Sequence, residues 1–102
     1  MLRVVLCNCS PGESKELGRA LVEEGLAACV NVLPSVTSCY VWEGEYCEDE
    51  EHTLLIKTTA ERYSELEERL VELHSYDVPE VIAMEPRDVF AAYDEWAHEQ
   101  TS

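Results

Sequence analysis

The sequence predicts an α+β fold in which two helices pack on one face of an antiparallel sheet. Strand-like apolar runs occur at residues 2–7, 28–33 and 81–84, and segments with helical apolar spacing lie between them. Two further strand-like segments, within residues 36–58, are typical of a long hairpin. At 102 residues, the chain is expected to form one domain, residues 1–102, whose core needs neither disulfides nor metals.

The first strand is expected over residues 2–7, because a continuous apolar run is typical of a buried central strand. The helix that follows is expected to start at Ser10, with Pro11 at its first position and Glu13 completing a capping box. Gly25 then ends this helix, since glycine readily adopts the left-handed conformation that follows many helices.

The second strand is expected over residues 28–33 and ends at Pro34, which cannot donate a hydrogen bond to a sheet. A strand of alternating character resumes over residues 36–43. Gly44 favours a tight reversal, and the return strand is expected over residues 45–58.

A second capping box, Thr58 with Glu61, predicts another helix, whose leucines recur at helical spacing. A short strand over residues 81–84 ends at Pro86, and residues 89–97 form an amphipathic helix with an aromatic face. The resulting order is β-α-β-β-α-β with a closing helix. This order predicts a ferredoxin-like antiparallel sheet with two helices on one face, an extended hairpin arm and a C-terminal helix.

Charge and composition exclude several partners. The chain has 22 acidic and 7 basic residues, a net charge of −15, which disfavours nucleic acid and anionic membranes. No apolar run approaches the ~20 residues of a membrane helix, and the first residues lack the pattern of a signal peptide. Five cysteines without a C-x-x-C motif fit reduced thiols. These observations predict a cytoplasmic protein.

The hairpin arm is too long for so small a domain. A strand of about 14 residues would exceed 40 Å, whereas a domain of this length has a radius of gyration of ~13 Å. Tyr40, Trp42 and Tyr46 lie on the overhang, and exposed aromatic strands invite pairing with another chain. We therefore expect these side chains to form the interface of a homotrimer. The alternative is that they pack within one chain.

Several segments together resemble the CutA family of divalent-cation tolerance proteins. They are LAACVNVLP at 26–34, WEG at 42–44 with Ser38 and Tyr40 before it, LIKT at 55–58 and HSYDVPE at 74–80. The resemblance implies a ferredoxin-like fold, a tight homotrimer, a cytoplasmic location and a link to copper and other divalent metals. It also implies an architecture similar to that of PII signalling proteins, which suggests small-molecule sensing at clefts between subunits.

The resemblance further implies a metal site of Cys, His and Glu. The cysteine corresponds to Cys7 and the glutamate to Glu80, whereas Leu73 stands at the family's histidine position and His74 follows it. Antiparallel pairing of the first and last strands would bring Cys7 and Glu80 together, with His74 nearby. Such ligands suit Cu or Zn, bound weakly because the shell is not closed. The alternative is that Cys7 is a core residue, His74 caps a helix end and Glu80 is solvated or paired.

Other candidate groups favour structure over chemistry. Cys7 and Cys9 share one face of a strand, and Cys29 and Cys39 are expected in the core. The acidic run 48–51 with His52 alternates sides of a strand, so a solvated edge is favoured over a cation site.

No catalytic motif is present, so the sequence predicts a protein that is not an enzyme and requires no cofactor. Two functions remain open. One is a trimeric protein of divalent-metal tolerance, and the other is a trimeric sensor of a small molecule or scaffold for a partner protein.

Overall fold

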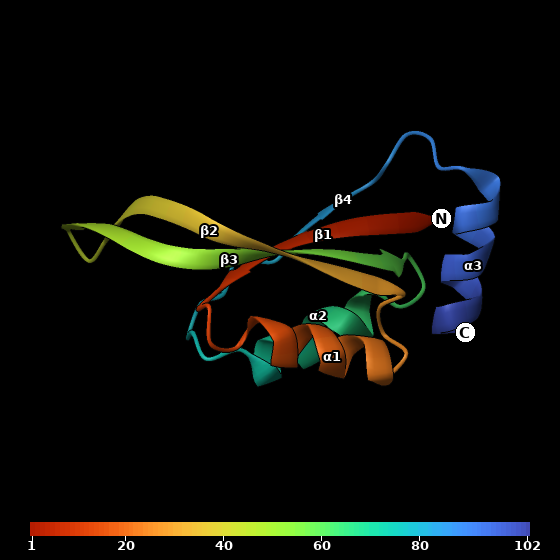
Figure 1. Cartoon of the computed structure of the whole chain (residues 1–102), viewed down its shortest axis with the longest axis horizontal. Helices are drawn as coiled ribbons and strands as arrows, with labels where there is room; N and C mark the ends of the chain where they lie inside the picture. Colours follow the sequence, from red (N-terminus) through yellow and green to blue (C-terminus); the bar gives the residue numbers. More distant parts are fainter.

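The computed structural model describes residues 1–102, with a four-stranded antiparallel sheet and three helices (Figure 1). The elements are β1 (Leu2–Cys9), α1 (Ser14–Glu23), β2 (Cys29–Trp42), β3 (Glu45–Thr59), α2 (Tyr63–Leu73), β4 (Ile82–Met84) and α3 (Ala91–Thr101). The strand order is β2-β3-β1-β4, and each neighbouring pair is antiparallel. The predicted α+β, ferredoxin-like order is therefore confirmed.

The core lies between the sheet and the pair α1 and α2, which run beneath the sheet in Figure 1. Side chains alternate along β1, so Val5, Cys7 and Cys9 point to the helices and are fully buried. Buried leucines and isoleucine from α1, α2 and β3 complete this layer: Leu17, Leu21, Leu54, Ile56, Leu66 and Leu70. The central strand extends two residues beyond the predicted 2–7, through Asn8 to Cys9.

Helix α1 begins at Ser14, three residues after the predicted first position, Pro11. Ser10 and Glu13 instead form a turn, in which the Glu13 carboxylate accepts hydrogen bonds from the Ser10 backbone N–H at 3.3 Å and hydroxyl at 2.7 Å. The predicted stop at Gly25 is confirmed by its positive φ of 72°. Leu26 donates to the Leu21 carbonyl and Gly25 to the Val22 carbonyl, which is the Schellman arrangement.

The capping box predicted for α2 does not form. Thr58 stays in the sheet opposite Arg3, and its buried hydroxyl donates to the Leu26 carbonyl at 2.6 Å. Thr59 lies at the turn instead, where its hydroxyl accepts a hydrogen bond from the Arg62 N–H at 3.3 Å. Helix α2 accordingly begins at Tyr63.

The prediction that the second strand ends at Pro34 is wrong. Strand β2 continues to Trp42, with a shift of register between Leu33 and Val36 and a positive φ of 62° at Ser35. Because β2 is an edge strand, a proline that lacks an N–H is tolerated at this bulge.

The β2–β3 hairpin forms the predicted arm (Figure 1). Glu43 and Gly44 connect the strands with φ values of 50° and 81°, as a type I′ turn requires. The arm projects to the left in Figure 1 and makes the molecule elongated, with extents of 45 × 26 × 22 Å along its principal axes. Cys39, expected in the core, is exposed on this arm.

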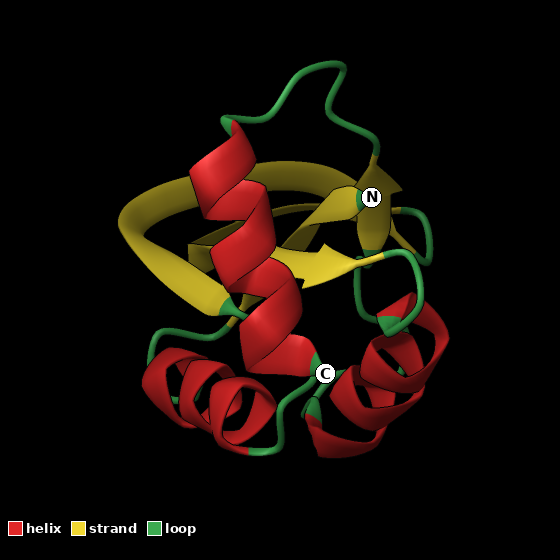
Figure 2. Ribbon diagram, turned by 90° about the vertical axis from the view of Figure 1, so that its right-hand side faces the viewer, coloured by secondary structure: helices red, strands yellow, loops and turns green.

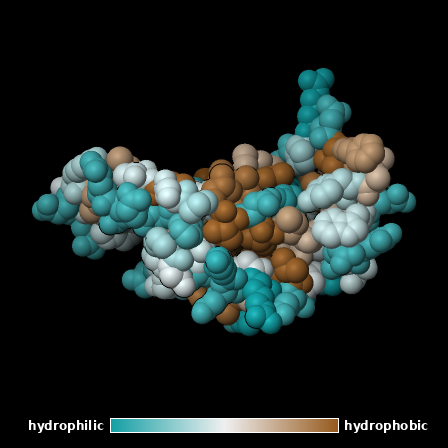
Figure 3. Space-filling model, in the orientation of Figure 1, coloured by the Kyte–Doolittle hydropathy of each residue, from teal (hydrophilic) through white to brown (hydrophobic).

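The second face of the sheet is only partly covered. Helix α3 packs over Leu2 at the end of the molecule away from the arm (Figures 1 and 2). The rest of this open face includes Leu6 and Leu55, with Ile82 and Met84 on β4 exposed by 51% and 42%. Figure 3 shows apolar surface gathered over the body of the molecule, whereas the arm is mainly hydrophilic.

Two further features concern the helices. Val89 and Phe90 precede α3 instead of lying within it, and Phe90 remains exposed. None of the three helices is long and apolar enough to cross a membrane.

Candidate functional site

At the end of β1, two of the three predicted metal ligands, His74 and Glu80, bond Asn8, and the third, Cys7, precedes Asn8 in the chain. Cys7 precedes Asn8 in the strand, with its Sγ 3.7 Å from the Asn8 carbonyl oxygen. His74 Nε2 lies 2.9 Å from the same carbonyl. The Asn8 side-chain amide donates to Glu80 Oε1 at 3.3 Å. The predicted pairing of β1 with the last strand is thus present, and it positions Glu80 beside β1.

Each of the three groups has its own partner in this arrangement. Cys7 is fully buried, and burial, followed by the neighbouring Cys9, raises the pKa of its thiol to about 12. His74 Nδ1 accepts a hydrogen bond from the Tyr76 N–H at 3.1 Å, so Nε2 carries the proton that Asn8 accepts. The chain contains no group of three or more His, Cys, Asp or Glu side chains placed to hold a metal ion.

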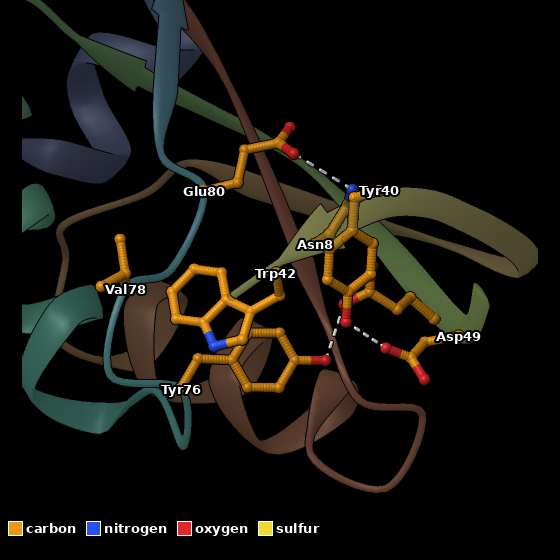
Figure 4. Close-up of a pocket in the computed structure, with 8 residues that line it drawn as sticks. Asn8, Tyr40, Trp42, Asp49, Tyr76, Val78 and Glu80 are labelled. Carbon is orange, nitrogen blue, oxygen red and sulfur yellow. Dashed lines mark hydrogen bonds between the residues drawn. The ribbon is translucent and has the colours of Figure 1, made fainter. Parts of the chain in front are cut away.

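A cleft of about 380 Å³ adjoins these residues, between the arm and the loop that joins α2 to β4 (Figure 4). It opens on the side of the sheet away from α1 and α2, because Asn8 follows Leu6 on that face. Its lining residues are Asn8, Tyr40, Trp42, Asp49, Glu51, Tyr76, Val78 and Glu80.

Hydrogen bonds between neutral donors and carboxylates organise the cleft. The Tyr40 hydroxyl donates to Asp49, and this bond raises the pKa of Tyr40 to about 12. The Tyr76 hydroxyl donates to Glu51 at 2.6 Å, and burial together with this bond raises the pKa of Tyr76. Both phenols are therefore neutral donors near neutral pH. Glu51 is only 7% exposed, although it belongs to the predicted solvated run 48–51.

The predicted interface aromatics lie on two faces of the arm. Tyr40 and Trp42 share one face and line the cleft within their own chain, although 40% and 52% of their surfaces remain exposed. Tyr46 lies opposite Val41 on the other face, where the two are 63% and 66% exposed. The Val41–Tyr46 face thus has no cover from its own chain.

Sequence reasoning did not identify Glu51, Tyr76 and Val78 as site residues. A signal was present, since strand alternation places Asp49 and Glu51 on the same face of the arm as Tyr40. Tyr76 and Val78 lie in the HSYDVPE segment, which has neither helical nor strand periodicity. The fold of that loop against the arm decides their position.

The other histidines have local partners. His52 Nδ1 lies 2.8 Å from the hydroxyl of Ser14, which is buried at the start of α1 and also donates to the Pro11 carbonyl. His98 Nδ1 lies 2.8 Å from the Asp94 carbonyl, one turn earlier in α3. Cys7 and Cys9 are both buried and free.

Comparison with known proteins identifies the family. The model of the CutA1 divalent ion tolerance protein matches residues 3–100. The chain belongs to this family. The divalent-cation tolerance protein CutA of Thermus thermophilus is 46% identical over 88 residues, which cover 86% of this chain and 85% of the relative. Protein CutA of Mus musculus is 42% identical over 88 residues, but these are only 50% of its length, so the chain spans about half of that relative.

Solved structures of the CutA family have the same fold. The Thermus thermophilus protein superimposes with a TM-score of 0.95 at 44% identity, with both chains fully covered. The structure described as the PII-like protein CutA from Nostoc superimposes with a TM-score of 0.93 at 34% identity, covering 98% of this chain and 97% of that one. The ferredoxin-like arrangement is therefore shared with CutA proteins, one of which is described as PII-like.

Proposed function

We propose that this chain acts, as a homotrimer in the cytoplasm, in tolerance of divalent metal ions, and that it binds copper or zinc weakly through Cys7, His74 and Glu80. The observation that carries the proposal is that His74 and Glu80 both bond Asn8, the neighbour of Cys7 in β1, although the Cys7 side chain points toward the helices and the Asn8 side chain to the opposite face. A thiol, an imidazole and a carboxylate are the donor types that Cu and Zn accept. The name of the Thermus relative, a divalent-cation tolerance protein, supports the same function.

The present side-chain arrangement predicts that binding is weak. To bind a metal, Cys7 must lose its thiol proton, although burial favours the protonated thiol, and His74 must give up one of its two hydrogen bonds. Both changes cost free energy before any ligand bond forms. We therefore place the protein among weak metal binders and not among proteins that need a metal to fold.

The trimer accounts for two uncovered surfaces. One is the open sheet face with Leu6, Ile82 and Met84, and the other is the Val41–Tyr46 face of the arm. Contiguous exposed apolar surface favours association, and a closed ring leaves no edge free. The five free cysteines support a reducing, cytoplasmic location for this single domain.

Metal titration of the purified protein tests the proposed site. Calorimetry with Cu²⁺ and Zn²⁺ should give stoichiometric binding, and Cys7→Ala and Glu80→Ala should each weaken it about tenfold or more. Cys9→Ala is the matched control, since Cys9 is equally buried on the same face of β1. Affinities unchanged in both site variants would remove the proposed ligands.

A second candidate function is that of a non-enzymatic sensor of a small molecule or a scaffold for a partner protein. The cleft of about 380 Å³ favours it, because its volume falls within the usual range of small-molecule sites, about 300–1,000 Å³. A screen of small metabolites by thermal shift would support this function if one of them stabilised the protein and Trp42→Leu abolished the effect.

A further inference from the structure

The cleft holds three carboxylates that no basic side chain of the same chain neutralises. Asp49, Glu51 and Glu80 accept hydrogen bonds only from tyrosine hydroxyls and an asparagine amide. Four of the five arginines, Arg3, Arg19, Arg62 and Arg69, pair with carboxylates elsewhere on the surface. Neutral donors satisfy hydrogen bonds but leave the charges uncompensated. A cation from solution is the partner that this electrostatic environment favours.

Glu51 provides the strongest argument that the cleft binds a cation. Its side chain is only 7% exposed, yet its partner, Tyr76, is a neutral phenol. Burying an ionised carboxylate is costly unless a positive charge lies nearby. Asp49 and Glu80, like Glu48 and Glu50, are exposed and have water to solvate them, so Glu51 is the one buried carboxylate of the cleft. The buried charge therefore distinguishes the cleft from the generally acidic surface.

Aromatic walls add a second preference. Tyr40, Trp42 and Tyr76 all extend into the cleft (Figure 4), and Val78 contributes apolar surface. The negative face of an aromatic ring attracts cations, and tryptophan does so most strongly. A hydrated metal ion makes little use of such rings, whereas an ammonium group on a carbon skeleton uses both the rings and the carboxylates.

The size of the cleft also favours a molecule over an ion. A volume of about 380 Å³ is far larger than a bare ion needs, and no three ligating side chains converge there. The carboxylates instead come from both sides of the cleft. Asp49 and Glu51 lie on β3 of the arm, and Glu80 lies on the loop opposite (Figure 4). Dispersed charges of this kind suit a ligand several atoms long.

We propose that this cleft binds a small organic ammonium ion. Its charged group lies among Asp49, Glu51 and Glu80, and its apolar part packs against Trp42 and Val78. The inference rests on the second candidate function, for which it names the class of ligand, and it is independent of metal binding at Cys7.

Calorimetry on the assembled protein at low salt tests this inference with matched probes. Benzylammonium and benzyltrimethylammonium carry the charge, and benzyl alcohol is the neutral probe of similar shape. The two cations should bind saturably, and the alcohol at least about tenfold more weakly. Asp49→Asn and Trp42→Leu should each weaken benzylammonium binding about fivefold or more.

The control variant is Glu68→Gln, which removes one charge from a different acidic region beside Arg69. It should leave benzylammonium binding unchanged, and scattering mass should show each variant assembled as the parent. If the scattering mass of Trp42→Leu differs from that of the parent, the test of the inference is the benzylammonium affinity of Asp49→Asn alone.

Three outcomes would overturn the inference: no saturable binding of either cation, equal binding of benzyl alcohol, or an equal loss in Glu68→Gln and Asp49→Asn. Saturable binding of the alcohol alone would remove the ammonium ligand but leave a small-molecule function in place. The copper affinity of Cys7→Ala bears only on the metal site.

Discussion

Asn8 shows how much one neutral residue contributes to this site. Its carbonyl accepts from His74, its amide nitrogen donates to Glu80, and its amide oxygen accepts from the Thr53 hydroxyl at 2.7 Å. These bonds tie β1 to the end of α2, to the segment before β4 and to β3. A polar residue at a strand position that faces away from the helices gave no sequence signal of this function, because its partners lie 45 to 72 residues away.

Glu13 links the loop before α1 to the loop after α2. Its carboxylate accepts hydrogen bonds from the Ser75 N–H at 3.1 Å, the Ser75 hydroxyl at 2.5 Å and the Ser10 hydroxyl at 2.7 Å. Burial opposes ionisation, but the bonds from Ser75 and Ser10 outweigh it and lower the pKa of Glu13. A folded-state pKa below the unfolded one contributes stability above the unfolded pKa, and that contribution disappears as pH falls through the folded pKa.

We therefore expect Glu13→Gln to lower the free energy of unfolding at pH 7 by about 1 kcal/mol, with a smaller effect below pH ~4. Urea unfolding of parent and variant from pH 7 to pH 3 measures the difference. Glu68→Gln, on the exposed face of α2, is the control and should have little effect. A Glu13→Gln difference that stays constant with pH would contradict this account of the carboxylate.

Thr58 provides a second residue-scale prediction. Its fully buried hydroxyl donates to the Leu26 carbonyl, which otherwise has no partner from the adjacent strand. Thr58→Val keeps the shape but leaves that carbonyl unsatisfied, so we expect a loss of about 1–3 kcal/mol. Thr37→Val is the matched control, because the Thr37 hydroxyl bonds Glu50 at an exposed site and should contribute less than about 1 kcal/mol. Chemical denaturation of both variants measures the two losses in free energy of unfolding. Equal losses would contradict the conclusion that the buried hydrogen bond contributes more than the exposed one.

At the scale of elements, the arm depends on its turn. Glu43 and Gly44 both have positive φ, and a β-turn of this type strongly prefers Asn-Gly. Glu43→Asn should raise the free energy of unfolding by about 0.5–1 kcal/mol, and Glu43→Val should lower it by more. Thermal unfolding measures both. If the valine variant is as stable as the parent, the turn does not limit the stability of the arm.

Most elements could be predicted from the sequence because their signals are local. Gly25 marks the end of α1 and Gly44 the tip of the arm through backbone conformations that glycine adopts most readily. The errors arose where a distant partner decides. Pro34 predicted the end of a strand, but β2 continues past the bulge because it remains paired with β3. Thr58 predicted a helix cap, but its hydroxyl donates to the Leu26 carbonyl, and Thr58 therefore stays in the sheet.

The candidate site was predictable only in part. The predicted antiparallel pairing of the first strand with the last is confirmed. The alternative that Cys7 is a core residue agrees with its full burial. Nothing in the sequence indicated that both nitrogens of His74 have partners, or that the cleft beside them is lined by Trp42 and Tyr76. Those features depend on how the loop after α2 packs against the arm, which has no periodicity that a sequence could reveal.

At the scale of the whole molecule, net charge affects stability. The chain carries 22 acidic and 7 basic residues, and the pairs formed by Arg3, Arg19, Arg62 and Arg69 leave most carboxylates without a counter-charge. Salt screens this repulsion, with a Debye length that falls from ~10 Å at 0.1 M to ~3 Å at 1 M. We expect the midpoint of thermal unfolding to rise by several degrees between low and molar KCl. No rise, or a fall, would contradict net repulsion in the folded state.

The open sheet face leads to a prediction about the oligomeric state. Ile82 and Met84 are half exposed on β4, beside Leu6, and no element of the chain covers them. If this face is buried in the proposed homotrimer, light scattering should give three times the chain mass of 11.6 kDa at micromolar concentration. Ile82→Lys would place a charge in that contact and should shift the mass toward a single chain. Val22→Lys is the matched control, since Val22 is 42% exposed on α1 in the opposite layer, and its mass should not change. A parent protein that is monomeric would remove the trimer, whereas a trimeric Ile82→Lys would move the contact from the sheet face to the Val41–Tyr46 face of the arm.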